Sequence, residues 1–154
     1  MSKFIKSFQI FPIELFRVNN GHYVRLREWT GQRPVYDIHT QNGYVKAKAM
    51  DPTSYAPPNG ASMRPNSQRN IDLINNRRGL DVVVYSVPAG TKLPDDLILV
   101  HEFKEHYSLQ PARDMHISDL NEKLTKFFQT YGNVKSKQAW LNAYKSGSTG
   151  LSKF

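Results

Sequence analysis

The stretch "LDVVVYSVPAGTKLPDDLILVHEF", residues 80–103, decides the fold because it holds two apolar runs with a turn between them. In the first run, the consecutive valines Val82, Val83 and Val84 are typical of a strand that is buried on both faces. The "PDD" turn then precedes the second run, "LILV". We therefore expect two strands here, the first of them fully buried.

The segment "HEFKEHYSLQP", residues 101–111, resembles a metalloprotease zinc motif at first sight. That motif needs two histidines four residues apart, so that both project from one face of a helix. His101 and His106 are five residues apart, which turns the second away by about 140° on a helix and sends it to the opposite surface of a strand. The spacing argues against a zinc site and favours two strand ends that meet at a turn.

Upstream of this region the sequence predicts short strands separated by turns. The segments "FQIF", "ELFRV", "HYVRLREW" and "QNGYVKAKAM" fit this pattern, and Asn42-Gly43 is a strong turn signal. Residues 51–68 contain four prolines and few apolar residues, which indicates an irregular loop. Long loops of this kind in compact domains tend to be functional or disordered.

Helical patterns lie mainly near the end of the chain. "SDLNEKLTKFFQTYG" places apolar residues on one face, with Ser118 as the N-cap and Gly132 as the terminator. "NVKSKQAWLNAYK" predicts a second, basic helix, and the tail at 146–154 is expected to be flexible. A shorter helix is expected after Ser67. The fold class is therefore α+β, with a strand-rich body and C-terminal helices.

The composition indicates one folded domain over residues 1–154. The hydrophobic fraction of 39% and the charged fraction of 22% are those of a globular protein. The chain has no cysteine, which excludes disulfides, thiolate metal sites and thiol nucleophiles. The net charge of +8 favours contact with a polyanion or a phosphate-bearing small molecule, although a simple solvated basic surface is the alternative. The longest apolar run, "DLILV", is too short to span a membrane.

The first thirteen residues carry Lys3 and Lys6 and no acidic residue. This pattern fits a cleaved organelle-targeting leader or an opening strand. The segment has no small-residue cleavage site and no arginine. We therefore expect the opening strand.

Four pieces of the sequence occur together in the order typical of a known toxin family. They are "LFRV" near the start, "SYAPPNGAS" in the middle, the "VPAGTKLPDDL" turn, and "HYSLQP" followed by a helix. In this order the chain resembles the Tse-two family, the second exported effector of type VI secretion and its relatives. The resemblance implies an ADP-ribosyltransferase-like fold, with a mixed β-sheet core and C-terminal helices.

The resemblance also implies an activity. Such a protein would be a cytotoxin that uses NAD as co-substrate and transfers ADP-ribose to a macromolecular acceptor, either a protein or a nucleic acid. Its site of action would be the cytoplasm of a cell, and a neutralising immunity protein is expected as a partner. The acceptor and the delivery route stay open.

Three positions match the family motifs. Arg17 in "LFRV" is expected to bind NAD, because a guanidinium can donate several hydrogen bonds to phosphate and ribose oxygens. Ser62 in "NGAS" matches the serine of the family's Thr-Ser pair, while Ala61 stands in place of the threonine. The match implies a catalytic and NAD-binding role for Ser62, whose hydroxyl would hold the strand edge and bond to the nicotinamide ribose. His106 in "HYSLQP" is the expected catalytic histidine, since imidazole can move a proton near neutral pH. Tyr107 beside it is a further candidate for cofactor contact, although on a strand it would face the core.

Other interpretations of the sequence stay open. The glutamate that ADP-ribosyltransferases commonly use has no secure counterpart, since the resemblance selects neither Glu102 nor Glu105. NAD hydrolysis is therefore an alternative to transfer. A basic, non-catalytic nucleic-acid-binding module of the same fold is a second alternative. A third is a protein that acts by contact alone, for which "FIKSFQIF" would offer an apolar edge.

Overall fold

The computed structural model of the chain describes residues 5–32 and 35–144, so the predicted flexible tail at 146–154 lies outside the described residues. The strands of the described part are β1 Lys6–Phe8, β2 Leu15–Asn20, β3 Tyr44–Val45, β4 Ala61–Met63, β5 Val82–Val87, β6 Leu97–Phe103, β7 His106–Pro111, β8 Met115–His116 and β9 Asn133–Ser136. The helices are η1 Lys48–Met50, η2 Pro52–Ser54, α1 Gln68–Asn76, α2 Ile117–Tyr131 and α3 Lys137–Tyr144.

One sheet has the strand order β1-β6-β7-β4, with all neighbours antiparallel. Strands β6 and β7 form a hairpin whose turn contains Lys104 at a φ of 44°, which confirms that the two strand ends meet at a turn. The register shifts between His101 and Phe103, which leaves Glu102 as an extra residue on β6. On β7, Tyr107 and Leu109 face the main core, as expected from strand alternation.

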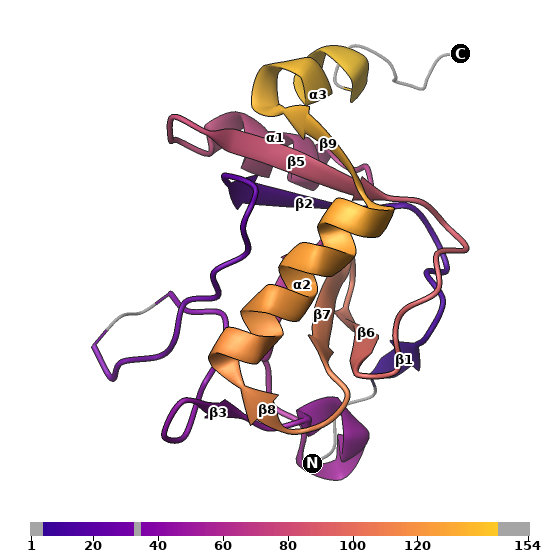
Figure 1. Cartoon of the computed structure of the whole chain (residues 1–154). Helices are drawn as coiled ribbons and strands as arrows, with labels where there is room; N and C mark the ends of the chain where they lie inside the picture. The colour runs from indigo at the N-terminus through magenta and orange to yellow at the C-terminus, as the bar shows by residue number, and fades with distance from the viewer. Residues whose placement is uncertain (1–4, 33–34, 145–154) are drawn as a thin grey trace.

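A second sheet has the order β2-β5-β9, again antiparallel. All six residues of β5 are buried, which confirms the prediction of a strand covered on both faces. Val82 and Val84 pack against α1 and α3, whereas Val83 and Tyr85 face the main core beneath α2. The two-sided burial of this strand therefore comes from helices on opposite faces of the sheet (Figure 1).

The main core lies between the two larger sheets and α2. Helix α2 runs beside β7 in Figure 1 and contributes Leu120, Leu124, Phe127 and Phe128 to this core. The Phe128 ring stacks on that of Tyr85, with ring centroids 5.1 Å apart. This helix thus packs the two sheets against each other along the stripe that its sequence predicts.

Several local predictions differ from the structure. The N-cap of α2 is His116, whose Nδ1 accepts from the backbone N–H of Ser118 at 3.1 Å, so the prediction of Ser118 as the cap is wrong by two residues. The segment "NVKS" forms β9 rather than the start of a helix, because it completes the free edge of β5. The strand predicted for "HYVRLREW" does not form, and the only β-pairing within this segment is an isolated β-bridge between Glu28 and Ile38.

Other predictions of local structure are confirmed. Ser67 caps α1 by accepting from the backbone N–H of Asn70 at 3.2 Å. Asn42 and Gly43 have positive φ angles of 53° and 80°, as a tight hairpin turn requires. The α+β class is confirmed too, with mixed sheets and helices near the C-terminus. No helix in the described part of the chain is long and apolar enough to cross a membrane.

We predict that Gly60→Ala destabilises the protein, because an added Cβ would lie 2.1 Å from the Leu109 carbonyl oxygen. Strand β4 would have to move away from β7, and the expected loss is about 1–3 kcal/mol of unfolding free energy. Urea denaturation followed by circular dichroism measures it. Gly90→Asn is the comparison, since a Cβ there meets nothing within 4 Å and its cost comes from the φ of 88° alone, which asparagine adopts more readily than most residues. Wild-type stability of Gly60→Ala would contradict the close packing at Gly60.

Candidate functional site

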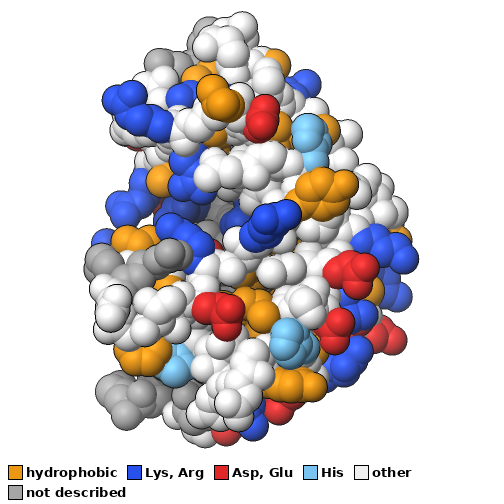
Figure 2. Space-filling view, turned by 60° about the vertical axis from the view of Figure 1, so that its left-hand side comes forward, with side chains coloured by type: hydrophobic (Ala, Val, Ile, Leu, Met, Phe, Trp, Pro, Cys, Tyr) orange, Lys and Arg blue, Asp and Glu red, His pale blue; other side chains and the backbone are white. Residues whose placement is uncertain are grey.

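A cleft with a volume of about 800 Å³ opens between β2, the segment after it, β4 and α1. Figure 2 shows Lys and Arg side chains gathered on this side of the molecule. The lining residues that the structure describes include six arginines and one acidic residue: Arg17, Arg25, Arg27, Arg64, Arg77, Arg78 and Asp37. The cleft is therefore strongly cationic.

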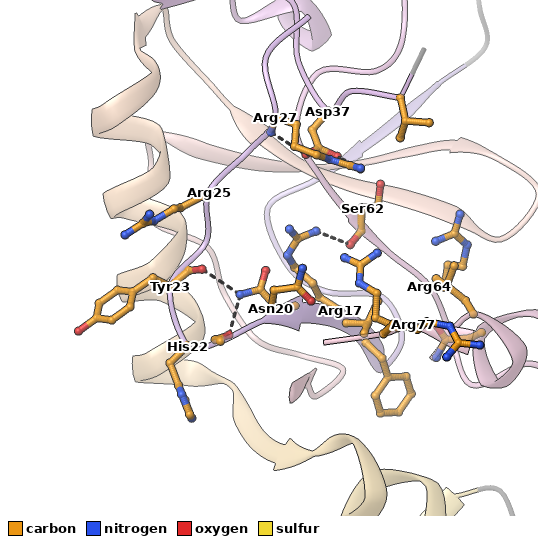
Figure 3. Close-up of a pocket in the computed structure, with 18 residues that line it drawn as sticks. Arg17, Asn20, His22, Tyr23, Arg25, Arg27, Asp37, Ser62, Arg64 and Arg77 are labelled. Carbon is orange, nitrogen blue, oxygen red and sulfur yellow. Dashed lines mark hydrogen bonds and ion pairs between the residues drawn. The ribbon is translucent and has the colours of Figure 1, made fainter. Parts of the chain in front are cut away.

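Arg17 lies in the middle of the cleft (Figure 3). On β2 its neighbours Phe16 and Val18 point to the helices α1 and α3, so alternation aims Arg17 to the other face, toward β4. Its side chain is buried, with 9% of the residue exposed, and one terminal nitrogen donates to the Ser62 carbonyl oxygen at 3.2 Å. Burial lowers the pKa of Arg17 to about 10, a shift that Asp37 opposes and Arg77 adds to.

The other arginines differ in their surroundings. Arg27 forms an ion pair with Asp37 at 3.1 Å at one end of the cleft, as Figure 3 shows. Arg25 and Tyr23 point away from Arg17 in the same view. Burial lowers the pKa of Arg64, and repulsion from Arg69 lowers it further. Positive charge in the cleft thus exceeds what its acidic residue can neutralise.

Three buried nitrogens on residues that line this cleft have no hydrogen-bond partner within the described residues. They are Nε of Arg17, Nε of Arg77 and Nδ2 of Asn70. A buried donor without a partner costs about 1–3 kcal/mol, and native proteins rarely keep several at one place. All three atoms are donors, and they belong to residues of the cleft lining.

Ser62 connects the cleft to His106. It lies on β4 opposite Ser108 of β7, and its Oγ is 3.1 Å from Nε2 of His106. Its carbonyl oxygen accepts from Arg17, so two hydrogen bonds link the three residues that the sequence singled out. Ser62, expected in an irregular loop, is in fact fixed on a strand.

A second group of residues lies behind His106. Its Nδ1 is 2.6 Å from Oε1 of Glu102, a side chain with 2% exposure. The hydroxyl of Tyr55 donates to Oε2 of Glu102, and Nε2 of Gln110 donates to that hydroxyl at 2.6 Å. Burial, followed by the hydrogen bond to Glu102, raises the pKa of Tyr55, so this phenol stays protonated. The ring of Phe103 stacks on His106, with centroids 5.1 Å apart.

Sequence reasoning missed Tyr55 and Gln110 and left Glu102 undecided. A spacing of four residues between Glu102 and His106 across a predicted tight turn was the available signal. Glu105, the other glutamate, accepts from Ser67 Oγ at 3.2 Å at the start of α1. Of the two glutamates, Glu102 is therefore the one that contacts His106.

Tyr107 takes a different position from the other candidates. Its side chain belongs to the main core and stacks on the ring of His101, with centroids 4.3 Å apart. It is therefore on the face of β7 opposite His106. Within residues 5–32 and 35–144, no group of three or more His, Asp or Glu side chains could hold a metal ion.

The family model described as "Tse2 ADP-ribosyltransferase toxin" matches residues 13–140. The chain belongs to this family. The matched segment includes Arg17, Ser62, Glu102 and His106, so the cleft and the residues behind it all lie within the family domain. No curated protein and no solved structure matches the chain.

We predict that Arg17→Met stabilises the ligand-free protein, by about 1–3 kcal/mol, because it removes a buried cation that has no ion pair among the described residues. The penalty of the charged side chain is fully present at neutral pH. It is relieved as pH rises through about 10, where the folded protein releases the proton more readily than the unfolded chain.

Chemical denaturation at pH 7 measures this effect, with the exposed Arg25→Met as the control that should change stability by less than about 0.5 kcal/mol. A marked loss of stability in Arg17→Met would show instead that the hydrogen bond to Ser62 outweighs the burial of the charge.

Proposed function

We propose that this Tse2-family protein binds NAD in the cleft around Arg17 and transfers the ADP-ribose part to a macromolecular acceptor. Family membership supports the class of reaction. The observation that carries the proposal is the cationic lining of the cleft, which has six arginines and one acidic residue among the described residues. NAD is rich in the acceptor oxygens that such guanidinium donors need, on its pyrophosphate and its two riboses.

The dimensions and charge of the cleft fit this substrate. A volume of about 800 Å³ falls within the range of small-molecule sites, roughly 300–1,000 Å³. Arg17 and Arg77 would donate to the phosphate oxygens, and a guanidinium suits them because its donors form a fixed fork. Asn70 would donate to a ribose or amide oxygen. Charge-assisted hydrogen bonds of this kind contribute about 1.5–3 kcal/mol each.

The chemistry proposed for the site is a displacement at the ribose carbon that carries nicotinamide. The N-glycosidic bond breaks and nicotinamide leaves with the bonding pair, while positive charge builds on the ribose as in glycoside cleavage. A nucleophilic atom of the acceptor forms the new bond to this carbon and passes its proton to Nε2 of His106. The hydroxyl of Ser62, 3.1 Å from that nitrogen, would orient the nicotinamide ribose.

The acceptor and the cellular setting follow from the same chemistry. The acceptor is a protein or a nucleic acid, and the excess of cleft arginines is compatible with either. Its place of action is the cytoplasm of a cell, where NAD is abundant. A neutralising immunity protein belongs to the proposal, because an enzyme that consumes NAD would harm the cell that makes it.

We predict that NAD labelled on its adenylate phosphate transfers label to macromolecules of a cell lysate when the protein is added. Protease and nuclease digestion then distinguish a protein acceptor from a nucleic acid, and chromatography of the free label measures hydrolysis. His106→Ala should lower the initial rate by about 10²–10⁴-fold, the usual contribution of a general acid or base. His101→Ala is the matched control, and it should keep the wild-type rate.

Retention of the protein on nucleic acid without any turnover of NAD would contradict the proposal and favour the non-catalytic binding module. Equal rates for the two histidine variants would remove His106 from the reaction. Release of label only as free ADP-ribose would assign NAD hydrolysis in place of transfer.

We predict that induced expression of the wild-type chain arrests the growth of a bacterial host. Arg17→Met should relieve this arrest, because the variant loses charge-assisted contacts to the NAD phosphates while its fold persists. Growth curves measure the effect, with circular dichroism of the purified variants as the control for folding. Normal growth of cells that contain abundant folded wild-type protein would contradict the toxin function.

A further inference from the structure

A chain of polar contacts runs from the interior of the first sheet to the cleft. It leads from Gln110 through Tyr55 to Glu102, and from Glu102 through His106 to Ser62. We propose that Glu102 is a positioning residue that holds His106 with the proton on Nδ1, so that Nε2 is the basic nitrogen that faces Ser62, a residue of the cleft lining. This inference rests on the proposed function and assigns the roles of three residues behind the histidine.

A bulge in β6, rather than the regular alternation of side chains along a strand, determines where the Glu102 side chain points. His101 pairs with Tyr107 and Phe103 pairs with His106, so these two pairs are two residues apart on β6 but only one residue apart on β7. Glu102 is the extra residue of this bulge, and bulges near active sites commonly re-aim a side chain. The bulge brings its carboxylate to 2.6 Å from the imidazole across the hairpin.

The two oxygens of Glu102 have separate partners. Oε2 accepts from the hydroxyl of Tyr55, which in turn accepts from the buried amide of Gln110. Oε1 lies 2.6 Å from Nδ1 of His106 as an ion-pair contact, although neither atom has a hydrogen bond of regular geometry within the part of the chain that the structure describes. A carboxylate with only 2% exposure needs partners on both oxygens, because a buried charge without them is strongly unfavourable. Tyr55 and Gln110 therefore fix the carboxylate, and the carboxylate faces the ring.

The groups around His106 determine which ring nitrogen carries the hydrogen in the neutral imidazole. An ionised carboxylate only accepts hydrogen bonds, so the neutral imidazole places its hydrogen on the nitrogen that faces Glu102. Nε2 then carries the lone pair, and the Ser62 hydroxyl donates to it at 3.1 Å. A neutral ring in the opposite tautomer would turn its lone pair to the carboxylate and could accept no proton at the cleft.

The arrangement of these groups points to catalysis rather than to packing alone. A base that is oriented by a third group and contacts a hydroxyl is the pattern of activated sites in unrelated enzymes. Here the series ends at Ser62, which lines the cleft and also contacts Arg17. The stacked ring of Phe103 covers His106 on one side and limits the access of water.

The test compares Glu102→Gln with Glu105→Gln, which changes the same type of side chain three residues away. Nitrogen-15 NMR of histidine-labelled protein reports the tautomer, and the His106→Ala spectrum assigns the signal. We expect the wild-type ring to carry its proton on Nδ1. In Glu102→Gln the amide can donate to Nδ1, so the proton should move to Nε2 in at least half of the molecules. Glu105→Gln should keep the wild-type tautomer.

Steady-state turnover of NAD gives the second measurement. Glu102→Gln should lower kcat by about 10²–10⁴-fold, the range expected when a general base is held in the wrong protonation state. The KM for NAD should change by less than about threefold, because the arginines of the cleft are unaltered. A purely structural role for Glu102 would leave kcat and the tautomer of the folded protein unchanged, and this result would overturn the proposal.

A third variant covers the case in which Glu102→Gln fails to fold. Tyr55→Phe removes one hydroxyl without changing the charge, and it should lower kcat about tenfold with the wild-type KM. Unchanged kcat in folded Tyr55→Phe would then overturn the role of the network. If the wild-type protein turns over no NAD, the proposed function fails, while the tautomer of His106 still tests whether Glu102 positions the ring.

Discussion

The buried guanidinium of Arg17 joins the two larger sheets, and the site depends on it. Strand β2 belongs to one sheet and β4 to the other, and the contact from Arg17 to the Ser62 carbonyl oxygen crosses between them. Neighbouring backbone hydrogen bonds between Phe16 and Arg64 hold the same two strands together. Ser62 also contacts His106, so this one residue links the cation of the cleft to the histidine.

The buried charge and the unpartnered donors of the cleft residues lower the stability of the ligand-free protein and provide groups that can bind a ligand. Burial lowers the pKa of Arg17, and the unpartnered donors of Arg77 and Asn70 lie in the same cleft. Charges and donors of this kind oppose folding while no ligand meets them, and they make the later contact with an oxygen-rich ligand stronger. The surrounding structure offsets the cost with apolar packing, above all around β5, which is covered on both faces.

The sequence predicts those parts of the structure that depend on local patterns. The valine run of β5, the stripe of α2 and the cap at Ser67 are of this kind, and the family motifs select Arg17, Ser62 and His106. The network behind the histidine escapes such reasoning because it depends on pairings between distant segments. Tyr55 comes from the proline-rich segment and reaches Glu102, 47 positions along the chain. The bulge that positions Glu102 also cannot be recognised from the hydrophobic periodicity of the sequence.

The alternation of side chains on β4 explains why Ala61 can replace the threonine of the family motif. Ala61 is 0% exposed and packs in the main core, whereas Ser62, the next residue on β4, points to the opposite face. A threonine hydroxyl at this position would therefore face apolar side chains and could not reach the cleft without a change in backbone. Its absence removes no group from the face that carries His106. In this chain the hydroxyl chemistry of the motif rests on Ser62, which Arg17 holds through the backbone and His106 contacts through the side chain.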